Sequence, residues 1–254
     1  MVGAGVAVDG AEQDLKRYER QIKIFGEEGQ RRLRKAKITI AGAGGLGSVS
    51  AAYLTVAGVG GIRVVDRDVV DLSNLNRQIL HWEKDIGREK AESFEEKLSQ
   101  MNPDVEVMVL SEKIVEDNVA DVIKGSDLIV DALDNFQTRY LLNRVALEKK
   151  IPFFHGAVYG FEGQVTTIIP GETACLRCIF PEAPAPETFP VIGATCGVIG
   201  CIQATEVVKY IVGVGELLTN RLLVWDGLNA RMEEFGVERN PACEGCGLDE
   251  DRKS

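Results

Sequence analysis

The stretch KITIAGAGGLGSVSAAYLTVAG, residues 37–58, decides the fold of this chain. Its first part, KITIAG at 37–42, is a short apolar run with β-branched residues, which predicts a buried strand. Further glycines follow, and an alanine-rich stretch at 46–57 predicts a helix. A strand, a glycine-rich turn and a helix in this order indicate an α/β fold.

The same alternation continues toward the C-terminus. Residues 61–68, 105–110 and 127–132 are apolar runs that predict strands. Residues 87–101 predict a helix with a charged face that ends at an Asn-Pro pair, and a further helical stretch is expected around 117–124. Strands that alternate with helices of this length predict a doubly wound, Rossmann-like and mostly parallel sheet, covered on both faces.

The second half has a different pattern. Two strand-like segments, 152–160 and 163–170, are separated only by Phe161 and Glu162, and such a short link favours an antiparallel hairpin. A proline-rich loop leads to an apolar helix at 194–212, and RLLVWDG and ARMEEFGV predict a closing pair of strands. The expected fold class is therefore α/β, with the parallel sheet extended by antiparallel strands.

The chain contains no repeat and no evident linker, so a single domain over residues 1–254 is expected. Within it, residues 1–13 predict a flexible tail, 14–150 a nucleotide-binding half and 151–254 a second half. Residues 14–35 mix basic and apolar side chains, which predicts one or two short amphipathic helices broken near Gly26.

Charge and hydropathy exclude several kinds of protein. The 254 residues include 39 Asp and Glu against 29 Lys and Arg, and a net charge of −10 disfavours nucleic acids and anionic membranes as partners. The longest weakly polar run, 191–205, is shorter than the ~20 apolar residues of a membrane span and predicts a buried helix. The first residues lack a basic segment like that of a secretory signal, so a cytoplasmic protein is expected.

The glycine-rich turn predicts a nucleotide site. Gly42, Gly44 and Gly47 form a G-x-G-x-x-G pattern between a predicted strand and a predicted helix. These glycines permit a tight turn, a close approach of phosphate to backbone N–H groups, and helix–strand packing. Asp66 ends the next strand, where a carboxylate can accept hydrogen bonds from ribose hydroxyls. Both adenine dinucleotides and ATP fit this pattern.

Two C-x-x-C pairs predict a metal site. Cys175 and Cys178 form the first pair, and Cys243 and Cys246 form the second. Four thiolates suit a tetrahedral Zn²⁺ without an open position, which makes the site structural. A redox dithiol, an iron–sulfur cluster and four unrelated buried thiols are the alternatives. Cys196 and Cys201 lie outside this quartet, on the predicted apolar helix, and are expected to be small core residues.

A group of polar residues favours phosphoryl or nucleotidyl transfer over hydride transfer. Arginine and lysine neutralise a triphosphate and its transition state, and a carboxylate at the end of a strand can hold Mg²⁺. The candidates that follow the predicted strands are Asp68, Asn74, Arg77, Gln78, Lys90 and Asp134.

Several ordered motifs give the chain a resemblance to the MoeB/ThiF/HesA family, the bacterial and archaeal relatives of ubiquitin-activating enzymes. The motifs cover nearly the whole chain: RYERQI, GAGGLGS, VVDRDVVDLSNLNRQ, GREKAE, DALDN, GVIGCIQATEVVK and the two C-x-x-C pairs. The resemblance implies adenylation of the C-terminal glycine carboxylate of a small ubiquitin-like protein. That protein is typically a sulfur carrier ending in Gly-Gly, and the reaction uses ATP and Mg²⁺ and releases pyrophosphate.

The resemblance also implies roles for individual residues. The loop glycines, namely Gly42, Gly44, Gly45 and Gly47, would line the nucleotide pocket, and Asp66, Asp68 and Lys90 would contact the ribose and phosphates. The candidate catalytic residues are Arg77, which with Asn74 would bind the triphosphate, Asp134, which would bind magnesium, and Arg20. Arg20 resembles an arginine that enters the partner subunit's ATP site, which implies a homodimer. Residues 151–254 would then be the carrier-binding half.

The chemistry requires no general base, because a carboxylate nucleophile is already ionised near neutral pH. His81 and His155 are therefore expected to be structural. Some family members carry a thioester or persulfide cysteine between the first cysteine pair and the apolar helix, whereas residues 179–195 contain none. Cys196 is the nearest candidate. The chain ends soon after Cys246, so any sulfur is expected to come from another protein rather than from a fused sulfurtransferase domain.

Three other functions stay open at this point. The glycine loop and Asp66 also suit an NAD(P)- or FAD-dependent oxidoreductase. A non-catalytic partner that binds ubiquitin-like proteins is a second alternative, and the joint presence of Arg20, Arg77 and Asp134 argues against it. Adenylation of a non-protein carboxylate is the third.

Overall fold

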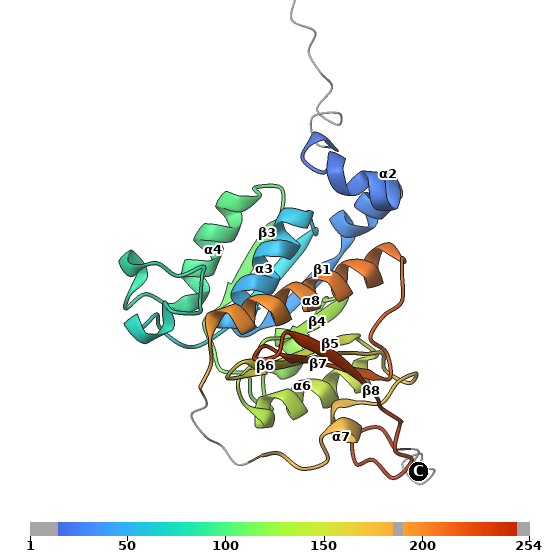
Figure 1. Ribbon diagram of the computed structural model, residues 1–254. Coiled ribbons are helices and arrows are strands. Elements are labelled where there is room, and N and C mark those ends of the chain that lie inside the picture. Colours follow the sequence, from blue (N-terminus) through green and yellow to red (C-terminus); the bar gives the residue numbers. More distant parts are fainter. Residues whose placement is uncertain (1–14, 185–189, 248–254) are drawn as a thin grey trace, which may run out of the picture.

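The computed structural model describes residues 15–184 and 190–247. They form one eight-stranded sheet in the order β3-β2-β1-β4-β5-β6-β7-β8, with helices on both faces (Figure 1). The mixed α/β sheet that the sequence predicts is confirmed. The predicted tail at 1–13 lies outside the described residues, as does part of the proline-rich loop.

Five strands run parallel, because helical crossovers join them in the order expected for a doubly wound fold. They are β1 (Lys37–Ala41), β2 (Gly61–Val65), β3 (Glu106–Leu110), β4 (Leu128–Asp131) and β5 (Phe153–Tyr159). The helices between them are α3 (Gly45–Ala57), α4 (Lys90–Met101), α5 (Val119–Val122) and α6 (Phe136–Lys149). Two short 3-10 turns, η1 (Leu72–Asn74) and η2 (Glu83–Asp85), interrupt the long connection between β2 and α4.

The sheet continues as antiparallel strands, as predicted. β5 pairs with β6 (Glu162–Ile168), which pairs with β7 (Arg221–Asp226), and β7 pairs with β8 (Arg231–Gly236) at the edge. The predicted hairpin and closing pair are both confirmed. The short helix α7 (Leu176–Ile179) lies in the connection that follows β6.

The apolar side chains form a core on each face of the sheet. On β1, Ile38 and Ile40 belong to the core under α3 and α4, whereas Ala41 belongs to the core under α5 and α6. The alternation follows from the two-residue period of a strand. Since both faces are covered, the parallel strands consist almost entirely of apolar residues.

The long helix α8 (Gly193–Val212) lies in the first of these cores. By length and composition it could cross a membrane, with a mean hydropathy of 1.3, but half of that segment is buried inside the protein. It packs against α3 and β5. A helix in the core of a large α/β domain is rich in apolar residues because its surroundings are apolar, as those of a membrane helix are. The predicted buried helix is confirmed.

The first described helix, α2 (Glu19–Lys35), contains the predicted break. Gly26 has a φ of 71°, in the left-handed region that a glycine adopts without strain. The last turn of α2 contacts the end of α8, where Arg32 Nη1 donates a hydrogen bond to the Val212 carbonyl at 3.3 Å.

Two differences from the sequence prediction bear on the site. Helix α6 was not predicted, because its buried face includes Arg139 and Asn143, which interrupt the apolar periodicity. The second strand ends at Val65 rather than at residue 68. Residues 66–68 instead form an irregular segment at the carboxyl end of the sheet, where Asp66 contacts the glycine loop and Asp68 contacts Lys90 at the start of α4.

Candidate functional site

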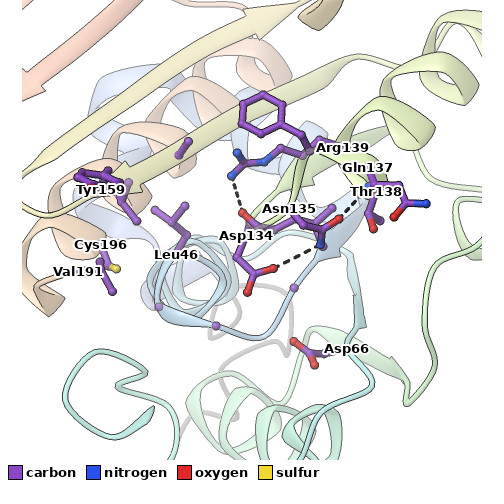
Figure 2. A pocket seen from close by; sticks show the side chains of 18 of the residues that line it. Leu46, Asp66, Asp134, Asn135, Gln137, Thr138, Arg139, Tyr159, Val191 and Cys196 are labelled. Atoms are coloured by element: carbon purple, nitrogen blue, oxygen red, sulfur yellow. Dashed lines mark hydrogen bonds between the residues drawn. The ribbon is translucent and has the colours of Figure 1, made fainter. Parts of the chain in front are cut away.

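A cavity of about 1140 Å³ opens at the carboxyl ends of the parallel strands. Its lining comes from the segments that directly follow β1, β2, β3 and β4, and it extends to β5, β6 and β7. Asp66 and Asp134 both line this space (Figure 2). Doubly wound sheets bind ligands at this edge, because the loops there converge where the strand order reverses.

The glycine loop forms one wall of the cavity. Gly42 has a φ of 104°, and a Cβ on Gly47 would lie 2.0 Å from the Gly42 carbonyl oxygen, so both positions require glycine. A Cβ on Gly44 would meet only Gln78, at 3.9 Å, so this glycine faces open space. Gly42, Gly44 and Gly45 line the cavity, whereas Gly47 lies behind it, where α3 packs on β1.

Asp66 joins the glycine loop to the end of β2. Its Oδ2 accepts a hydrogen bond from the Ala43 N–H at 2.7 Å, and its Oδ1 accepts one from the Asp68 N–H at 2.8 Å. Burial raises the pKa of this carboxyl, although the two backbone hydrogen bonds and the charge of Lys90 partly offset the effect. Each carboxylate oxygen has a further lone pair, so Asp66 can also accept hydrogen bonds from a ligand.

Lys90 brings a positive charge to the same wall. Its ammonium lies 3.1 Å from Oδ2 of Asp68 and is 8% exposed, whereas the Asp68 side chain is 57% exposed. The buried Lys90 ammonium is therefore paired, in the wall of the cavity, with the solvent-exposed carboxylate of Asp68. An anionic ligand can replace Asp68 as the partner of Lys90, or it can bind the Lys90 ammonium together with Asp68.

Arg77 lies in the connection between the two 3-10 turns and lines the cavity, with its Nη1 donating to the Ser73 carbonyl at 2.9 Å and to Asn76 at 3.0 Å. Asn74 does not line the cavity. Its Oδ1 accepts a hydrogen bond from the Asp71 N–H at 3.2 Å and so closes the η1 turn. The structure therefore gives Asn74 a place in the loop before Arg77 rather than at the cavity surface.

Asp134 lies in the loop after β4, exposed and facing the cavity (Figure 2). One carboxylate oxygen accepts a hydrogen bond from Asn135 at 3.3 Å, and the side chain is otherwise open to a ligand. Asn135 also caps the next helix, since its Oδ1 accepts from the Thr138 N–H at 2.9 Å. An exposed carboxylate that faces a cavity of this kind is a suitable ligand for Mg²⁺.

Behind Asp134 lies a buried charged cluster that the sequence analysis missed. Asp131 Oδ2 lies 2.7 Å from His155 Nδ1 and 3.3 Å from Arg139 Nε, and all three side chains are buried. Arg139 also donates to the carbonyls of Leu133 and Gly156. Burial would raise the pKa of Asp131, but Arg139 and His155 lower it. The DALDN motif contains Asp131, but its place at the end of an apolar run predicts only a strand residue.

Arg20 is not part of this cavity. It is an exposed residue at the start of α2, and this end of α2 contacts the C-terminal end of α3, where Tyr18 closely approaches Gly58. The glycine loop is at the other end of α3, about 20 Å away at 1.5 Å per residue. The structure therefore does not bring Arg20 to the other predicted site residues of the same chain.

The four cysteines of the two C-x-x-C pairs lie together, with all sulfurs within 4.8 Å of one another. The distances are 3.9 Å for Cys175–Cys178, 3.6 Å for Cys175–Cys243 and 3.4 Å for Cys178–Cys246. A tetrahedral zinc with Zn–S bonds of ~2.3 Å needs sulfurs about 3.8 Å apart. The quartet thus fits a zinc ion that joins residues 243–246 to α7.

Cys196 lines the cavity near Arg77 but is only 2% exposed. Its sulfur packs against Gly45, where an added Cβ would approach it to 2.7 Å. Burial raises the pKa of the thiol, and the nearby Arg77 charge only partly offsets this. The position thus combines core packing, as predicted, with a place at the edge of the cavity.

The chain matches the ThiF family over residues 18–245. It is 46% identical over 241 residues to the SAMP-activating enzyme E1 of Haloferax volcanii, covering 92% of this chain and 89% of that protein. It is 39% identical over 248 residues to the sulfur carrier protein adenylyltransferase of Thermus thermophilus, covering 92% of each chain.

Its fold also resembles that of Escherichia coli MccB, solved with MccA-N7isoASN. The TM-score is 0.84 at 22% identity, over 92% of this chain and 74% of that one. The family match spans nearly the whole chain and agrees with the resemblance inferred from the sequence motifs. The chain belongs to the ThiF family.

Proposed function

We propose that this protein is an ATP-dependent adenylyltransferase that activates the C-terminal glycine carboxylate of a small ubiquitin-like sulfur-carrier protein. The observation that carries the proposal is the single cavity that joins the glycine loop, Arg77, Lys90 and Asp134 to the antiparallel strands. The names of two relatives, a SAMP-activating enzyme and a sulfur carrier protein adenylyltransferase, support the same reaction.

The parallel half of the cavity would hold ATP. The backbone N–H groups of Gly44 and Gly45 lie at the N-terminus of α3. The helix dipole and the amides without a partner inside the helix favour a phosphate there. Asp66 would accept hydrogen bonds from the ribose. Lys90 and Arg77 would neutralise the phosphates, since both line the same space. An oxidoreductase needs no such pair of cations, and both named relatives argue against that alternative.

Asp134 would hold the Mg²⁺ that accompanies ATP. The donor set fits this ion, because the side chain is an exposed carboxylate in the cavity and accepts a hydrogen bond only on Oδ1, from the amide nitrogen of Asn135, among the described residues. When bound, the ion neutralises phosphate charge during transfer. The protein's own contribution is to hold the Asp134 loop in place through Arg139, which binds the Leu133 carbonyl.

The reaction itself needs alignment and charge neutralisation. An oxygen of the carrier's carboxylate attacks the α-phosphorus of ATP, and the bond from that phosphorus to the β-phosphate oxygen breaks, releasing pyrophosphate. Arg77 and Lys90 stabilise the negative charge that grows on the leaving group. The attacking carboxylate is ionised near neutral pH, so no side chain has to remove a proton.

The antiparallel half would receive the carrier. Tyr159, Glu162 and Gln164 of the β5–β6 hairpin line the outer part of the cavity. Nearby loops and β8 expose apolar side chains, including Phe161, Leu228, Met232 and Phe235. Phe161 and Leu228 lie on neighbouring turns, since the Gly227 N–H donates to the Phe161 carbonyl at 2.9 Å, and we infer that these exposed apolar side chains contact the carrier. We assign residues 14–150 to nucleotide binding and 151–254 to carrier binding within one domain, since one sheet runs through both.

The remaining predictions become proposals about assembly. Arg20 is exposed and distant from its own cavity, so a homodimer in which it enters the partner subunit's cavity would give it a role. A structural Zn²⁺ in the cysteine quartet would stabilise the C-terminal segment. The cytoplasm is the expected location.

The deciding experiment is ATP–pyrophosphate exchange by the purified protein, with and without small Gly-Gly-ending carriers from the same organism. Exchange that depends on one carrier supports the proposal and identifies the partner. ATP binding without exchange for any carrier would instead favour a non-protein carboxylate as the substrate or a non-catalytic role. Stabilisation by NAD(P) but not by ATP and Mg²⁺ would favour an oxidoreductase.

A further inference from the structure

Ala43 is the residue between the first two loop glycines, and side chains form hydrogen bonds with both its backbone N–H and its backbone carbonyl. Its N–H donates to Asp66 Oδ2 at 2.7 Å, and its carbonyl lies 3.1 Å from Nε2 of His81. His81 is 4% exposed and its other ring nitrogen, Nδ1, lies 2.9 Å from Ser93 Oγ on α4. The loop is therefore fixed from two sides, by the end of β2 and by the connection that precedes α4.

The direction of each hydrogen bond around His81 follows from its partners. Burial lowers the pKa of His81 to about 4, so the ring is neutral near pH 7 and carries one proton. The Ala43 carbonyl can only accept, which places that proton on Nε2. Nδ1 must then accept from the Ser93 hydroxyl, whose oxygen in turn accepts from the ammonium of Lys97 at 3.0 Å.

This chain of hydrogen bonds ends in a buried ion pair. The Lys97 ammonium also contacts Asp85 Oδ2, and the two side chains are 2% and 0% exposed. Asp85 accepts further hydrogen bonds from the Trp82 N–H at 2.9 Å and from Arg88 at 2.8 Å. Because every group has a fixed partner, the network holds His81 in one tautomer and one orientation.

The planarity of the peptide bond transmits this constraint to the cavity. The Ala43 carbonyl and the Gly44 N–H belong to one trans peptide unit, so they point in opposite directions. A hydrogen bond that fixes the carbonyl toward His81 therefore fixes the Gly44 N–H on the opposite side. Gly44 lines the cavity and has no side chain to shield this donor.

We propose that His81 is a positioning residue for the nucleotide: its Nε2–H holds the Ala43 carbonyl so that the Gly44 N–H is aimed at a phosphate of ATP. This inference rests on the proposed function in one respect, namely that the bound nucleotide is ATP. Ser93 and Lys97 support the role by keeping the proton of the ring on Nε2. Without this constraint the Ala43–Gly44 peptide unit can rotate, because the flanking glycines permit many backbone conformations.

Two substitutions separate positioning from packing. In His81→Gln, the amide nitrogen can reach the place of Nε2 and keep the bond to Ala43, whereas His81→Leu fills similar space without a donor. ATP affinity is measured by titration calorimetry with Mg²⁺ and without any carrier. His81→Leu is expected to bind ATP about tenfold more weakly, the effect of losing one aligned hydrogen bond, and His81→Gln within about threefold of wild type.

Thr166→Val is the matched control. Thr166 is also buried and donates one hydrogen bond to a backbone carbonyl, that of Leu218 at 3.1 Å, but it does not contact the loop. It is expected to lose thermal stability without losing ATP affinity. Unchanged ATP affinity in folded His81→Leu, or an equal loss of affinity in Thr166→Val, would overturn the proposal.

A second measurement needs neither ligand nor substitution. Nitrogen-15 NMR of the His81 ring distinguishes the two neutral tautomers, and the proposal requires the proton on Nε2. A proton on Nδ1 would refute it, even if His81→Leu fails to fold. If the wild type binds NAD rather than ATP, the proposed function fails, and the same comparison of variants with NAD still decides the role of His81.

Discussion

His155 Nδ1 lies 2.7 Å from Oδ2 of Asp131, and neither side chain is accessible to solvent. Asp131 is the last residue of β4, and Arg139 on α6 completes the cluster at 3.3 Å. The loop between them carries Asp134 and is held by Arg139 through the Leu133 carbonyl. A buried ionic group thus fixes the position of the proposed magnesium ligand, although none of its members was among the predicted site residues.

Replacing Asp131 by Asn is expected to destabilise the fold strongly. The substitution leaves Arg139 as a buried charge without a counter-ion, and breaking such a pair costs about 3–5 kcal/mol. Urea denaturation at pH 7 measures the change in unfolding free energy. The control is Asp121→Asn on the exposed side of α5, which is expected to change it by less than about 0.5 kcal/mol. Equal stability of the two variants would show that Asp131 does not neutralise Arg139.

The fold was largely predictable because its strands are short apolar runs separated by glycine and polar turns. β1 and α3 follow directly from the 37–58 segment, and the hairpin of β5 and β6 follows from its two-residue link. Helix α6 was not predictable from periodicity, since Arg139 and Asn143 occupy its buried face. Polar groups there are satisfied by the Asp131 cluster and by the Leu176 N–H, contacts that no local pattern encodes.

The site was predictable only where topology brings residues together. Asp66 and Asp134 follow β2 and β4, and the carboxyl ends of parallel strands meet at one edge. Asn74 forms a hydrogen bond in the turn before Arg77, so its place depends on the geometry of that loop. Arg20 lies near the end of α3 that is remote from the glycine loop, so its proposed role depends on assembly. The Ala43–His81 contact joins residues 38 positions apart through space, which the sequence alone does not indicate.

Asp134→Ala is expected to abolish carrier-dependent pyrophosphate exchange, with a loss of at least about a hundredfold, because an essential charge-stabilising group is removed. The fold should be retained, since Asp134 is exposed and its side chain makes one hydrogen bond within the described residues, with Asn135. Exchange is measured alongside thermal unfolding and zinc content. Retained exchange in the variant would rule out Asp134 as the magnesium ligand.

Cys243→Ser is expected to lower zinc content well below one ion per chain, because a hydroxyl is a far weaker ligand for Zn²⁺ than a thiolate. Residues 237–247 should then become sensitive to proteases. Metal content is measured by mass spectrometry of the dialysed protein. Cys201→Ser is the control, since Cys201 lies on α8 outside the quartet. Unchanged zinc in Cys243→Ser would count against a four-cysteine site.

The buried histidines predict a loss of stability in mild acid. Burial lowers the pKa of His81 to about 4, an effect to which Lys90 and Lys97 add and which Asp85 opposes. Between pH 6.5 and 4 the unfolded chain therefore binds more protons than the folded one, so stability falls as the pH falls. Each such group contributes a slope of up to about 1.4 kcal/mol per pH unit.

Burial also lowers the pKa of His155, which acts in the same direction. In His81→Gln the slope between pH 6.5 and 4 is expected to decrease by the contribution of one histidine, while that of His155 remains. Urea unfolding at several pH values between 6.5 and 4 gives the slope for each protein. The same slope in wild type and variant would mean that the pKa of His81 is the same in the folded and unfolded states.

The proposed role of Arg20 predicts complementation between two inactive variants. Arg20 lies near the end of α3 that is remote from the glycine loop, and α3 is about 20 Å long, so the proposal places Arg20 in the partner's cavity rather than in its own. Arg20→Ala and Asp134→Ala homodimers should each lack exchange activity, because every cavity is missing one group. A heterodimer of the two has one intact cavity, formed by the Asp134 of the Arg20→Ala chain and the Arg20 of the Asp134→Ala chain.

Mixing the two variants after dissociation and reassociation should therefore restore up to about a quarter of the wild-type activity, since half of the dimers would be mixed and each would hold one working site of two. Mixing either variant with itself is the control. If Arg20 acted within its own chain, each chain of the mixed dimer would keep one defect and no activity would return. Restored activity would thus establish both the dimer and the exchange of Arg20 between subunits. A dimer without the exchange of Arg20 would leave every cavity with one missing group.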